Sequence, residues 1–323
     1  MIDGRVFVTR EIAPDALARL REEFAEVDVW EAYEPPPPDK LAERAAGCVA
    51  IVTMISDRVD AELLNAAPTL RVVANMAVGY NNVDVATCAG RGVLVSNTPD
   101  VLEETTADLA FALMLAVARH VVASDADTRA GNWGLWHPAL WLGTDVYGAT
   151  LGIVGMGAIG SAVARRARGF DMRLRYTANN RRTEAEAALG AVYVPDLKEL
   201  LAQSDFVSLH VPLTVSTHNL MGAAELAAMR PTAFLINTSR GDVVDTEALL
   251  TALREGQIAG AGLDVTAPEP IPADHPLLAL PNVVVTPHIG SASFATRRRM
   301  AMMAVENAIA ACKGEAMPSR VAG

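Results

Sequence analysis

The sequence feature that most restricts the fold is a glycine pattern between an apolar run and a helical pattern. Residues 151–160 are LGIVGMGAIG, so Gly155, Gly157 and Gly160 have the spacing GxGxxG. In this context Gly155 permits a tight turn, Gly157 lets a pyrophosphate approach the backbone, and Gly160 lets the helix pack closely on the strand. The phosphates would lie at the helix N-terminus. The segment predicts a dinucleotide-binding unit; the alternative is a tight turn without a ligand.

Strand and helix patterns alternate in two stretches of the chain. In the first, we expect strands at 6–9, 27–30, 49–53, 70–75 and 93–97, and helices at 14–24, 39–46, 60–66 and 83–91. In the second, we expect strands at 150–154, 173–176, 191–194, 206–209, 233–237, 260–263 and 283–286, helices at 159–168, 197–202, 223–228 and 247–254, and a final helix at 294–313. Such alternation predicts an α/β protein with two doubly wound parallel-sheet (Rossmann-like) domains.

Three other segments have distinct patterns. A long helix is expected from Glu103 to about Arg129, and the prolines Pro35–Pro38 are expected in a loop, because proline disrupts helices and central strands. Residues 131–148 are rich in Gly and Trp without clean periodicity. We expect an ordered loop there, because its three tryptophans need a surface to pack on.

Composition excludes several classes of protein. There are 27 Lys and Arg against 38 Asp and Glu, a net charge of −11, which disfavours nucleic-acid and membrane partners. The three cysteines lack paired spacing, so we expect no disulfide framework, no metal site and a reducing compartment. No apolar signal segment follows Met1, and the apolar run 109–118 is about half a membrane span. A cytoplasmic location is the expectation.

Three ionisable residues follow late strands of the second stretch. Arg240, Glu269 and His288 each come shortly after an apolar run, at the sheet edge where open α/β sheets bind ligands. Together they can bind a carboxylate and move a proton. Singly, a strand-end arginine is usually a surface ion pair and a lone histidine is usually structural, so the argument depends on their combination with the dinucleotide pattern.

The segment after the second strand of the dinucleotide unit bears on cofactor choice. It contains Ala178, Asn179, Asn180, Arg181 and Arg182, whereas an NAD site would place an acid there for the ribose hydroxyls. No carboxylate is present to repel a 2′-phosphate, and the two arginines are close enough to attract one. This favours NADP, or use of both NADP and NAD; the alternative is two solvated surface arginines.

These patterns occur together with several others in an order that resembles the D-isomer-specific 2-hydroxyacid dehydrogenases, closest to the glyoxylate/hydroxypyruvate reductases. The matching segments are 75–84 (NMAVGYNNVD), 97–99 (NTP), 106–110 (TADLA), 155–160 (GMGAIG), 210–213 (HVPL), 237–241 (NTSRG), 262–265 (GLDV) and 287–290 (PHIG). The resemblance covers essentially the whole chain. It implies hydride transfer between NAD(P)H and a small 2-keto acid, with glyoxylate or hydroxypyruvate reduced to glycolate or D-glycerate.

The resemblance also implies domains. Residues 1–98 and 291–323 would form a discontinuous, flavodoxin-like substrate-binding domain, and residues 99–290 the dinucleotide-binding Rossmann domain, with a cleft between them. Arg240 would clamp the substrate carboxylate and polarise the keto oxygen, His288 would be the general acid, and Glu269 its partner, since an adjacent carboxylate favours a protonated imidazole.

Further site residues are implied in the same way. For substrate they are Met54, Asn75, the backbone amides of Val78 and Gly79, and Trp141, besides Arg240 and His288. For the cofactor they are Thr106, Gly155, Met156, Gly157, Ala158, Ile159, Gly160, Ala178, Asn179, Asn180, Arg181, Arg182, His210, Val211, Pro212, Thr217, Thr238, Ser239, Arg240, Asp264, His288 and Gly290. A homodimer is implied through the long helix and the Trp-rich loop, with Trp141 reaching the neighbouring subunit's site and limiting substrate size; the alternative for Trp141 is packing alone.

Departures from related families narrow this expectation. Glu269 stands where formate dehydrogenases have Gln, and Val78 where phosphite dehydrogenases have Lys. Asn179 stands where similar glyoxylate reductases commonly have Arg, which weakens the case for NADP without restoring an acid for NAD. The short tail does not match the appended domains of larger phosphoglycerate dehydrogenases. Two other functions stay open: a dehydrogenase for a bulkier 2-keto acid, and an NAD(H)-binding corepressor on the same scaffold.

Overall fold

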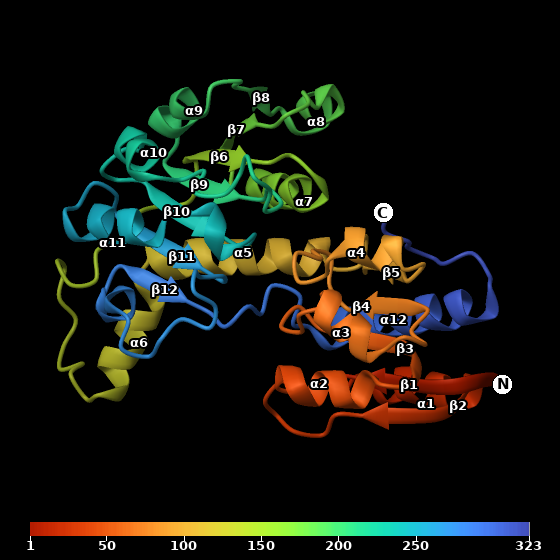
Figure 1. The fold of residues 1–323 in the computed structure, drawn as a ribbon. Coiled ribbons are helices and arrows are strands. Elements are labelled where there is room, and N and C mark those ends of the chain that lie inside the picture. Colours follow the sequence, from red (N-terminus) through yellow and green to blue (C-terminus); the bar gives the residue numbers. More distant parts are fainter. Residues whose placement is uncertain (323) are drawn as a thin grey trace. The chain divides into compact units, whose positions relative to one another are not determined.

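The computed structural model describes residues 1–322, which divide into two compact units (Figure 1). The first unit comprises Met1–Leu102 and the chain from Ala292 onward, and the second is Glu103–Ser291. The chain therefore passes between the units twice. The family resemblance implies crossings near residues 98 and 290.

The first unit is a five-stranded parallel sheet with helices on it. Its strands, in the order β2-β1-β3-β4-β5, pair only in parallel. The elements are β1 (Ile2–Val8), α1 (Pro14–Glu23), β2 (Phe24–Val29), α2 (Pro38–Ala45), β3 (Cys48–Thr53), α3 (Ala61–Ala66), β4 (Val72–Asn75), α4 (Val85–Gly90), β5 (Leu94–Ser96) and α12 (Phe294–Lys313). Helix α12 packs on β3 and β4 and against α1, which explains why the C-terminal segment belongs to this unit.

The second unit is a seven-stranded parallel sheet in the order β12-β11-β10-β9-β6-β7-β8. Its elements are α5 (Glu103–Ala118), α6 (Val121–Arg129), β6 (Thr150–Val154), α7 (Ala158–Arg168), β7 (Arg173–Thr177), α8 (Thr183–Leu189), β8 (Val192–Tyr193), α9 (Leu197–Gln203), β9 (Phe206–Leu209), α10 (Ala223–Ala228), β10 (Phe234–Asn237), α11 (Thr246–Arg254), β11 (Gly260–Leu263) and β12 (Val283–Val285). Two short 3-10 helices lie at Gly241–Val243 and Pro276–Ala279. The strand order reverses between β6 and β9, which is where open α/β sheets bind ligands.

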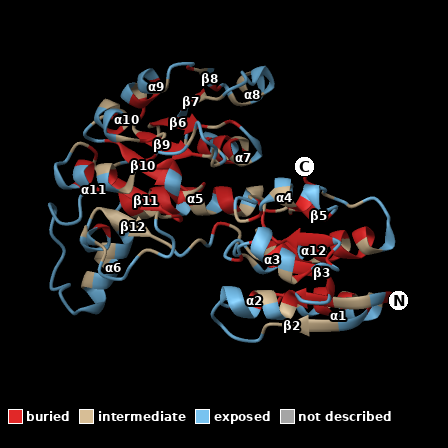
Figure 2. Cartoon of the chain, viewed as in Figure 1, coloured by how far each residue is buried: buried red, intermediate tan, exposed pale blue. Residues whose placement is uncertain are grey.

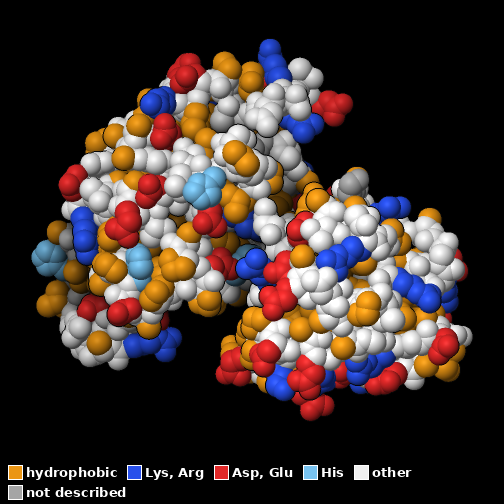
Figure 3. Space-filling view, viewed as in Figure 1, with side chains coloured by type: hydrophobic (Ala, Val, Ile, Leu, Met, Phe, Trp, Pro, Cys, Tyr) orange, Lys and Arg blue, Asp and Glu red, His pale blue; other side chains and the backbone are white. Residues whose placement is uncertain are grey.

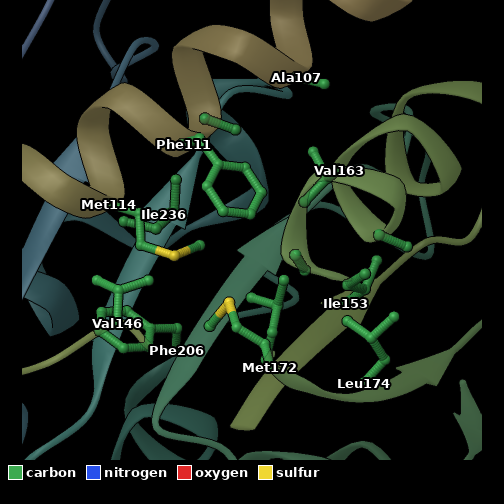
Figure 4. Packing of buried hydrophobic residues seen from close by; sticks show 14 of the residues in the cluster. Ala107, Phe111, Met114, Val146, Ile153, Val163, Met172, Leu174, Phe206 and Ile236 are labelled. Carbon is green, nitrogen blue, oxygen red and sulfur yellow. The ribbon is translucent and has the colours of Figure 1, made fainter. Parts of the chain in front are cut away.

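Helix α5 is buried against this second sheet. Phe111 and Met114 project from it toward Phe206 and Ile236 of the sheet (Figure 4), and Phe111 also stacks on Phe170. Strand β11 has glycine where the helix comes close; a Cβ at Gly262 would lie 3.0 Å from the Cβ of Leu113. The central strands of both sheets are buried (Figure 2), as expected for parallel strands covered on both faces.

The prediction of a single long helix over 103–129 is wrong. It is two helices, α5 and α6, bent by 63° at Arg119 and His120. His120 has a φ of 53°, and the amide of Thr144 donates to Ala118 O at 2.9 Å, so a distant loop takes the carbonyl at the end of α5. Among the described residues no single helix is long and apolar enough to cross a membrane; this bent pair passes that test only jointly, by length and composition.

Smaller differences concern Pro38, α8 and the Trp-rich loop. Pro38 opens helix α2, because a proline at the first helical position lacks only an amide that needs no partner there. Helix α8, which the sequence patterns did not predict, has no fully buried residue, and only Ala185 and Leu189 pack, partly buried, against the core. In the Trp-rich loop Trp133 and Trp136 are 72% and 80% exposed, so this chain supplies little of the packing surface expected for them. Elsewhere Lys and Arg are interspersed with Asp and Glu on the visible face of both units (Figure 3).

Candidate functional site

The glycine turn lies at the edge of the second sheet where the strand order reverses. Gly155 has a φ of +97°, and its amide donates to Thr177 O at 2.9 Å. A Cβ there would lie 2.6 Å from His210 O, so the segments after β6 and β9 are in contact. A Cβ at Gly160 would overlap Gly155 O, whereas one at Gly157 would meet no protein atom within 4 Å. The tight turn and the close helix packing are as predicted, and open space lies beside Gly157.

Helix α7 begins directly at this turn. Gly157 is its N-cap and provides no side-chain cap. The first amides of a helix have no partner within the helix, and they carry its positive dipole end. The exposed Ala158 and half-buried Ile159 follow, so this helix end is suited to an anion such as a pyrophosphate.

A groove of about 600 Å³ between the starts of α7 and α8 contains the arginines expected to attract a 2′-phosphate. Arg181 donates from Nε to Glu186 Oε1 at 2.8 Å and lies over the Tyr193 ring, so its charge already has a partner. Arg165, also in the groove, pairs with Glu104. Within residues 1–322 the exposed Arg182 guanidinium forms no ion pair. Of the two arginines expected to attract the phosphate, only Arg182 is available without breaking a salt bridge.

The rest of the 178–182 segment is open to solvent on one side. Ala178 is half-buried and its carbonyl accepts from Tyr193 Oη at 3.3 Å, while Asn179 and Asn180 are exposed. No acid stands among these residues.

The turn after β10 holds Arg240 in place. Asn237 Oδ1 accepts from the amide and hydroxyl of Ser239, and Asn237 Nδ2 donates to Arg240 O at 2.9 Å. Arg240 Nη1 donates to Ser239 O at 2.7 Å. Burial lowers the pKa of Arg240, against the opposite effect of the Glu269 charge, and a guanidinium remains charged at any working pH. Asn237, which was noted only as part of a motif, is the residue that shapes this turn.

Gly241 brings the turn after β10 against the loop that contains Glu269. A Cβ at Gly241 would overlap the carbonyl of Thr266, so only glycine fits. The amide of Thr266 lies 3.5 Å from Glu269 Oε2. Close backbone contact therefore places Arg240 near Glu269, close enough for their charges to act on each other.

Glu269 and His288 form a direct pair. His288 Nδ1 lies 2.6 Å from Glu269 Oε1, although the two residues are 19 positions apart. Burial raises the pKa of Glu269, but the hydrogen bond and charge of His288, with smaller contributions from the Thr266 amide and Arg240, lower it overall. Glu269 is therefore ionised at neutral pH, and its carboxylate faces Nδ1 of His288.

The backbone at His288 is held by Asp264. His288 has a φ of +53°, a conformation that is uncommon for residues other than glycine. Its amide donates to Asp264 O, and the Asp264 carboxylate accepts from Thr286 Oγ1 and from the amides of Ile289 and Gly290. Asp264 is 1% exposed, so its first role in this structure is to hold the turn that presents His288.

Several predicted cofactor residues lie close together with unused polar atoms. A Cβ at Gly290 would lie 3.1 Å from Asp264 Oδ2 and 3.4 Å from Thr106 Cγ2. Thr238 Oγ1 and His210 Nδ1 are buried without a hydrogen-bond partner. Burial lowers the pKa of His210 to about 3, and its Nε2 lies 2.8 Å from Ser208 Oγ. Buried polar atoms without partners at a sheet edge suit a polar ligand.

The remaining predicted cofactor residues belong to the turn after β9 and to neighbouring loops. Val211 touches the position of a Gly155 Cβ at 2.9 Å. Thr217 Oγ1 donates to Pro212 O at 2.6 Å, so that hydroxyl supports the loop. Met156 and Ser239 are buried.

The predicted substrate residues of the first unit lie on loops at the carboxyl ends of β3 and β4. Val78 and Gly79 are half-buried, and their amides donate no hydrogen bond within residues 1–322. Asn75 differs from the expectation that it lines a pocket: it is 0% exposed, and its Nδ2 donates to Gly79 O at 3.0 Å. Asn75 supports the loop from beneath.

Two further expectations concern Trp141 and the binding of a metal ion. Trp141 is 40% exposed in the second unit, and its ring lies 6.2 Å from that of His120. Among the described residues there is no cluster of His, Cys, Asp and Glu that could hold a metal ion.

Comparison with known proteins identifies the family. A model of the D-isomer specific 2-hydroxyacid dehydrogenase NAD binding domain matches residues 111–290. A glyoxylate reductase of Korarchaeum cryptofilum is 56% identical over 318 residues, 98% of this chain and 95% of that protein. A glyoxylate reductase of Pyrococcus furiosus is 52% identical, again over 98% of this chain and 95% of that protein. The chain belongs to the D-isomer-specific 2-hydroxyacid dehydrogenase family.

Solved structures of similar proteins share the fold. A protein of Thermus thermophilus has a TM-score of 0.93 at 50% identity, covering 98% of this chain and 100% of that chain. The NADPH-dependent glyoxylate/hydroxypyruvate reductase of Sinorhizobium meliloti, solved with NADP and malonate, has a TM-score of 0.86 at 36% identity, covering 99% and 97%. The predicted family, the α/β class and an oxidoreductase with an NAD-binding domain are thereby confirmed.

Proposed function

We propose that this dehydrogenase reduces glyoxylate and hydroxypyruvate to glycolate and D-glycerate with NADPH or NADH. The observation that supports it most directly is the 2.6 Å pair between His288 and Glu269, with Arg240 beside it on the edge of a dinucleotide sheet. An acid, its partner and a carboxylate-binding cation are what reduction of a 2-keto acid requires. The named relatives are glyoxylate reductases.

The residues present fit a dinucleotide. Open space at Gly157, the uncapped start of α7 and the orphaned Thr238 hydroxyl and His210 Nδ1 are places where a ligand's polar groups would be bound. The Gly155–Gly160 turn would hold the pyrophosphate, and the 178–182 segment the ribose. When bound, the reduced nicotinamide supplies the hydride.

The protein's part is to bind the acid and deliver a proton. Arg240 binds the substrate carboxylate with its planar fork and polarises the keto oxygen. His288 keeps Nδ1 on Glu269, which leaves Nε2 to donate a proton to the keto oxygen. The amides of Val78 and Gly79 would hold the other carboxylate oxygen. In this proposal residues 1–98 with 291–323 bind substrate and 99–290 bind the cofactor.

We further propose a homodimer that forms through the second unit, in the cytoplasm. The side chains that support it are the exposed apolar residues of α6 and the Trp-rich loop, namely Val121, Val122, Trp133, Leu135, Trp136, Leu140, Trp141 and Leu142. Large apolar side chains exposed in this number on neighbouring segments mark an interaction site more often than a free surface. Trp141 would then limit substrate size in the partner's site.

A substrate panel tests the proposal. Purified protein is mixed with NADPH or NADH and with glyoxylate, hydroxypyruvate, pyruvate or phenylpyruvate, and loss of nicotinamide absorbance is followed. We expect the two smallest polar acids to have the highest kcat/KM. A higher kcat/KM for phenylpyruvate would favour the bulky-acid alternative, and no turnover with any acid would favour a binding protein.

A further inference from the structure

One asparagine joins two loops at the carboxyl ends of neighbouring strands in the first unit. Asn82 Nδ2 lies 3.0 Å from Met54 O and 2.9 Å from Asp57 O, both in the loop after β3. The same nitrogen lies 3.2 Å from Asn75 Oδ1, at the end of β4. Asn82 therefore ties the 54–57 loop to the start of the 75–79 loop.

The contact continues through Asn75 to the backbone of Gly79. Asn75 is 0% exposed; its Oδ1 also accepts from Thr53 Oγ1 at 3.2 Å, and its Nδ2 donates to Gly79 O at 3.0 Å. Both ends of the Asn75 amide are thus occupied. Because an amide has a fixed plane, the orientation set at Oδ1 by Asn82 determines where Nδ2 holds Gly79.

The loop to which Asn82 is tied is itself anchored. Asp57 is 2% exposed, and its Oδ2 accepts from the Met54 amide at 2.7 Å and from Thr9 Oγ1 at 2.5 Å. Arg10 lies 3.7 Å from Asp57 Oδ1. Thr9 and Arg10, which directly follow strand β1, thereby hold the 54–57 loop, which makes it a firm support for Asn82.

The carbonyls of the 77–79 segment all accept a hydrogen bond, while the amides of Val78 and Gly79 have no acceptor among the described residues. Ala77 O accepts from the Thr98 amide at 2.8 Å, Val78 O from Asn97 Nδ2 at 2.9 Å, and Gly79 O from Asn75. The half-buried amides of Val78 and Gly79 donate to no atom of residues 1–322. Two neighbouring free amides can bind an anion, provided that the carbonyls between them are held back.

We propose that Asn82 is a positioning residue that sets these two amides for the substrate carboxylate. The inference rests on the proposed function, because it assumes that the anion is the carboxylate of a 2-keto acid. That carboxylate does not change during the reaction, so its contacts act equally in the ground and transition states. Loss of such a contact raises KM and leaves kcat nearly unchanged.

Three variants test the role of Asn82. Asn82→Ala removes the donor, and Asn82→Asp keeps the shape but places an anion against the Met54 and Asp57 carbonyls. Asp60→Ala is the matched control: Asp60 caps α3 in the same unit through the Glu62 and Leu63 amides, and its other side-chain contact is an ion pair with the exposed Arg58, outside both loops. For each variant we measure kcat and KM for glyoxylate, KM for the dinucleotide, and hydrogen exchange of the amides 76–80.

We expect Asn82→Ala to raise KM for glyoxylate about tenfold, with kcat and the dinucleotide KM within about threefold of wild type, since one lost contact of about 1.4 kcal/mol is tenfold in binding. Asn82→Asp should raise KM further, and both should speed exchange at 76–80. Asp60→Ala should alter neither. A glyoxylate KM within about twofold of wild type in both Asn82 variants, or a lower kcat at unchanged KM, would overturn the proposal. If wild type turns over no keto acid, the proposed function fails, while unchanged exchange at 76–80 would separately refute the tie through Asn82.

Discussion

At the scale of single residues, the proton donor is the first assignment to test. His288→Ala removes the imidazole but none of the groups expected to bind the dinucleotide phosphates. We expect kcat for glyoxylate to fall about 10²–10⁴-fold, because general acid catalysis contributes that much, with dinucleotide affinity little changed. Steady-state kinetics and dinucleotide titration measure the two effects. His218→Ala, at an exposed histidine of the same unit, is the control; similar losses in both variants would remove His288 from the mechanism.

The partner of His288 determines the pH dependence. The pKa of Glu269 is lowered, so its stabilising pair is present above the ordinary carboxyl value of 4.5 and is lost as pH falls through the lowered folded value. Glu269→Gln removes the carboxylate that titrates in this pair. We therefore expect a lower kcat for keto-acid reduction and a profile without the acid-side decline that wild type shows as Glu269 is protonated below 4.5. A pH–rate profile of both proteins checks this, and parallel profiles would contradict it.

Cofactor choice depends on which arginine is free. Arg181 is paired with Glu186, whereas Arg182 has no ion pair within the described residues, so we expect Arg182→Ala to raise KM for NADPH about tenfold and to leave KM for NADH unchanged. Arg181→Ala is the comparison variant and should affect NADPH less. The measurements are made at two salt concentrations, because an exposed phosphate contact is screened. If Arg182→Ala changes both cofactors equally, this segment does not recognise the 2′-phosphate.

At the scale of elements, the turn after β10 and the loop after β11 must approach closely. Gly241→Ala would push its new methyl group into the Thr266 carbonyl. Overpacking of this kind costs about 1–3 kcal/mol, so we expect a Tm lower by several degrees and a reduced kcat as Arg240 moves from Glu269. Gly90→Ala is the control, since a Cβ there meets nothing within 4 Å. Thermal unfolding and kinetics measure both quantities. An unchanged Tm and kcat in Gly241→Ala would show that the backbone near Thr266 can move aside for a methyl group at no cost.

At the scale of the whole molecule, the exposed apolar residues of the second unit predict assembly. Trp136 is 80% exposed, and a charge there would oppose burial in an interface. We expect wild type to be a dimer by light scattering and Trp136→Asp to be monomeric and less active. Tyr33→Asp, in the first unit and outside this patch, should remain dimeric. A monomeric wild type would refute the proposed homodimer.

The sequence by itself determined most of the elements and the family. Strands Thr150–Val154, Phe206–Leu209 and Gly260–Leu263 have the predicted bounds, because each is a short apolar run between residues that interrupt strands. The geometry of Gly155 and Gly160 was also predictable, since a tight turn and a close helix leave no room for a side chain. The strand bounds, the positive φ of Gly155 and the contact of Gly160 with the Gly155 carbonyl depend on near neighbours in the chain, and local patterns report such interactions.

Only the tertiary structure decided which groups are already partnered. Arg181 is taken by Glu186 and Tyr193, Asn75 is buried beneath the loop that it was expected to share with substrate, and Asn82 joins loops from two strands. The bend after α5 likewise depends on Thr144, which lies 26 residues beyond Ala118 in the chain and donates to its carbonyl. Composition and periodicity indicate which interactions a residue is able to form. Which of these it forms depends on hydrogen bonds between segments that are distant in the chain, because buried polar groups must find partners.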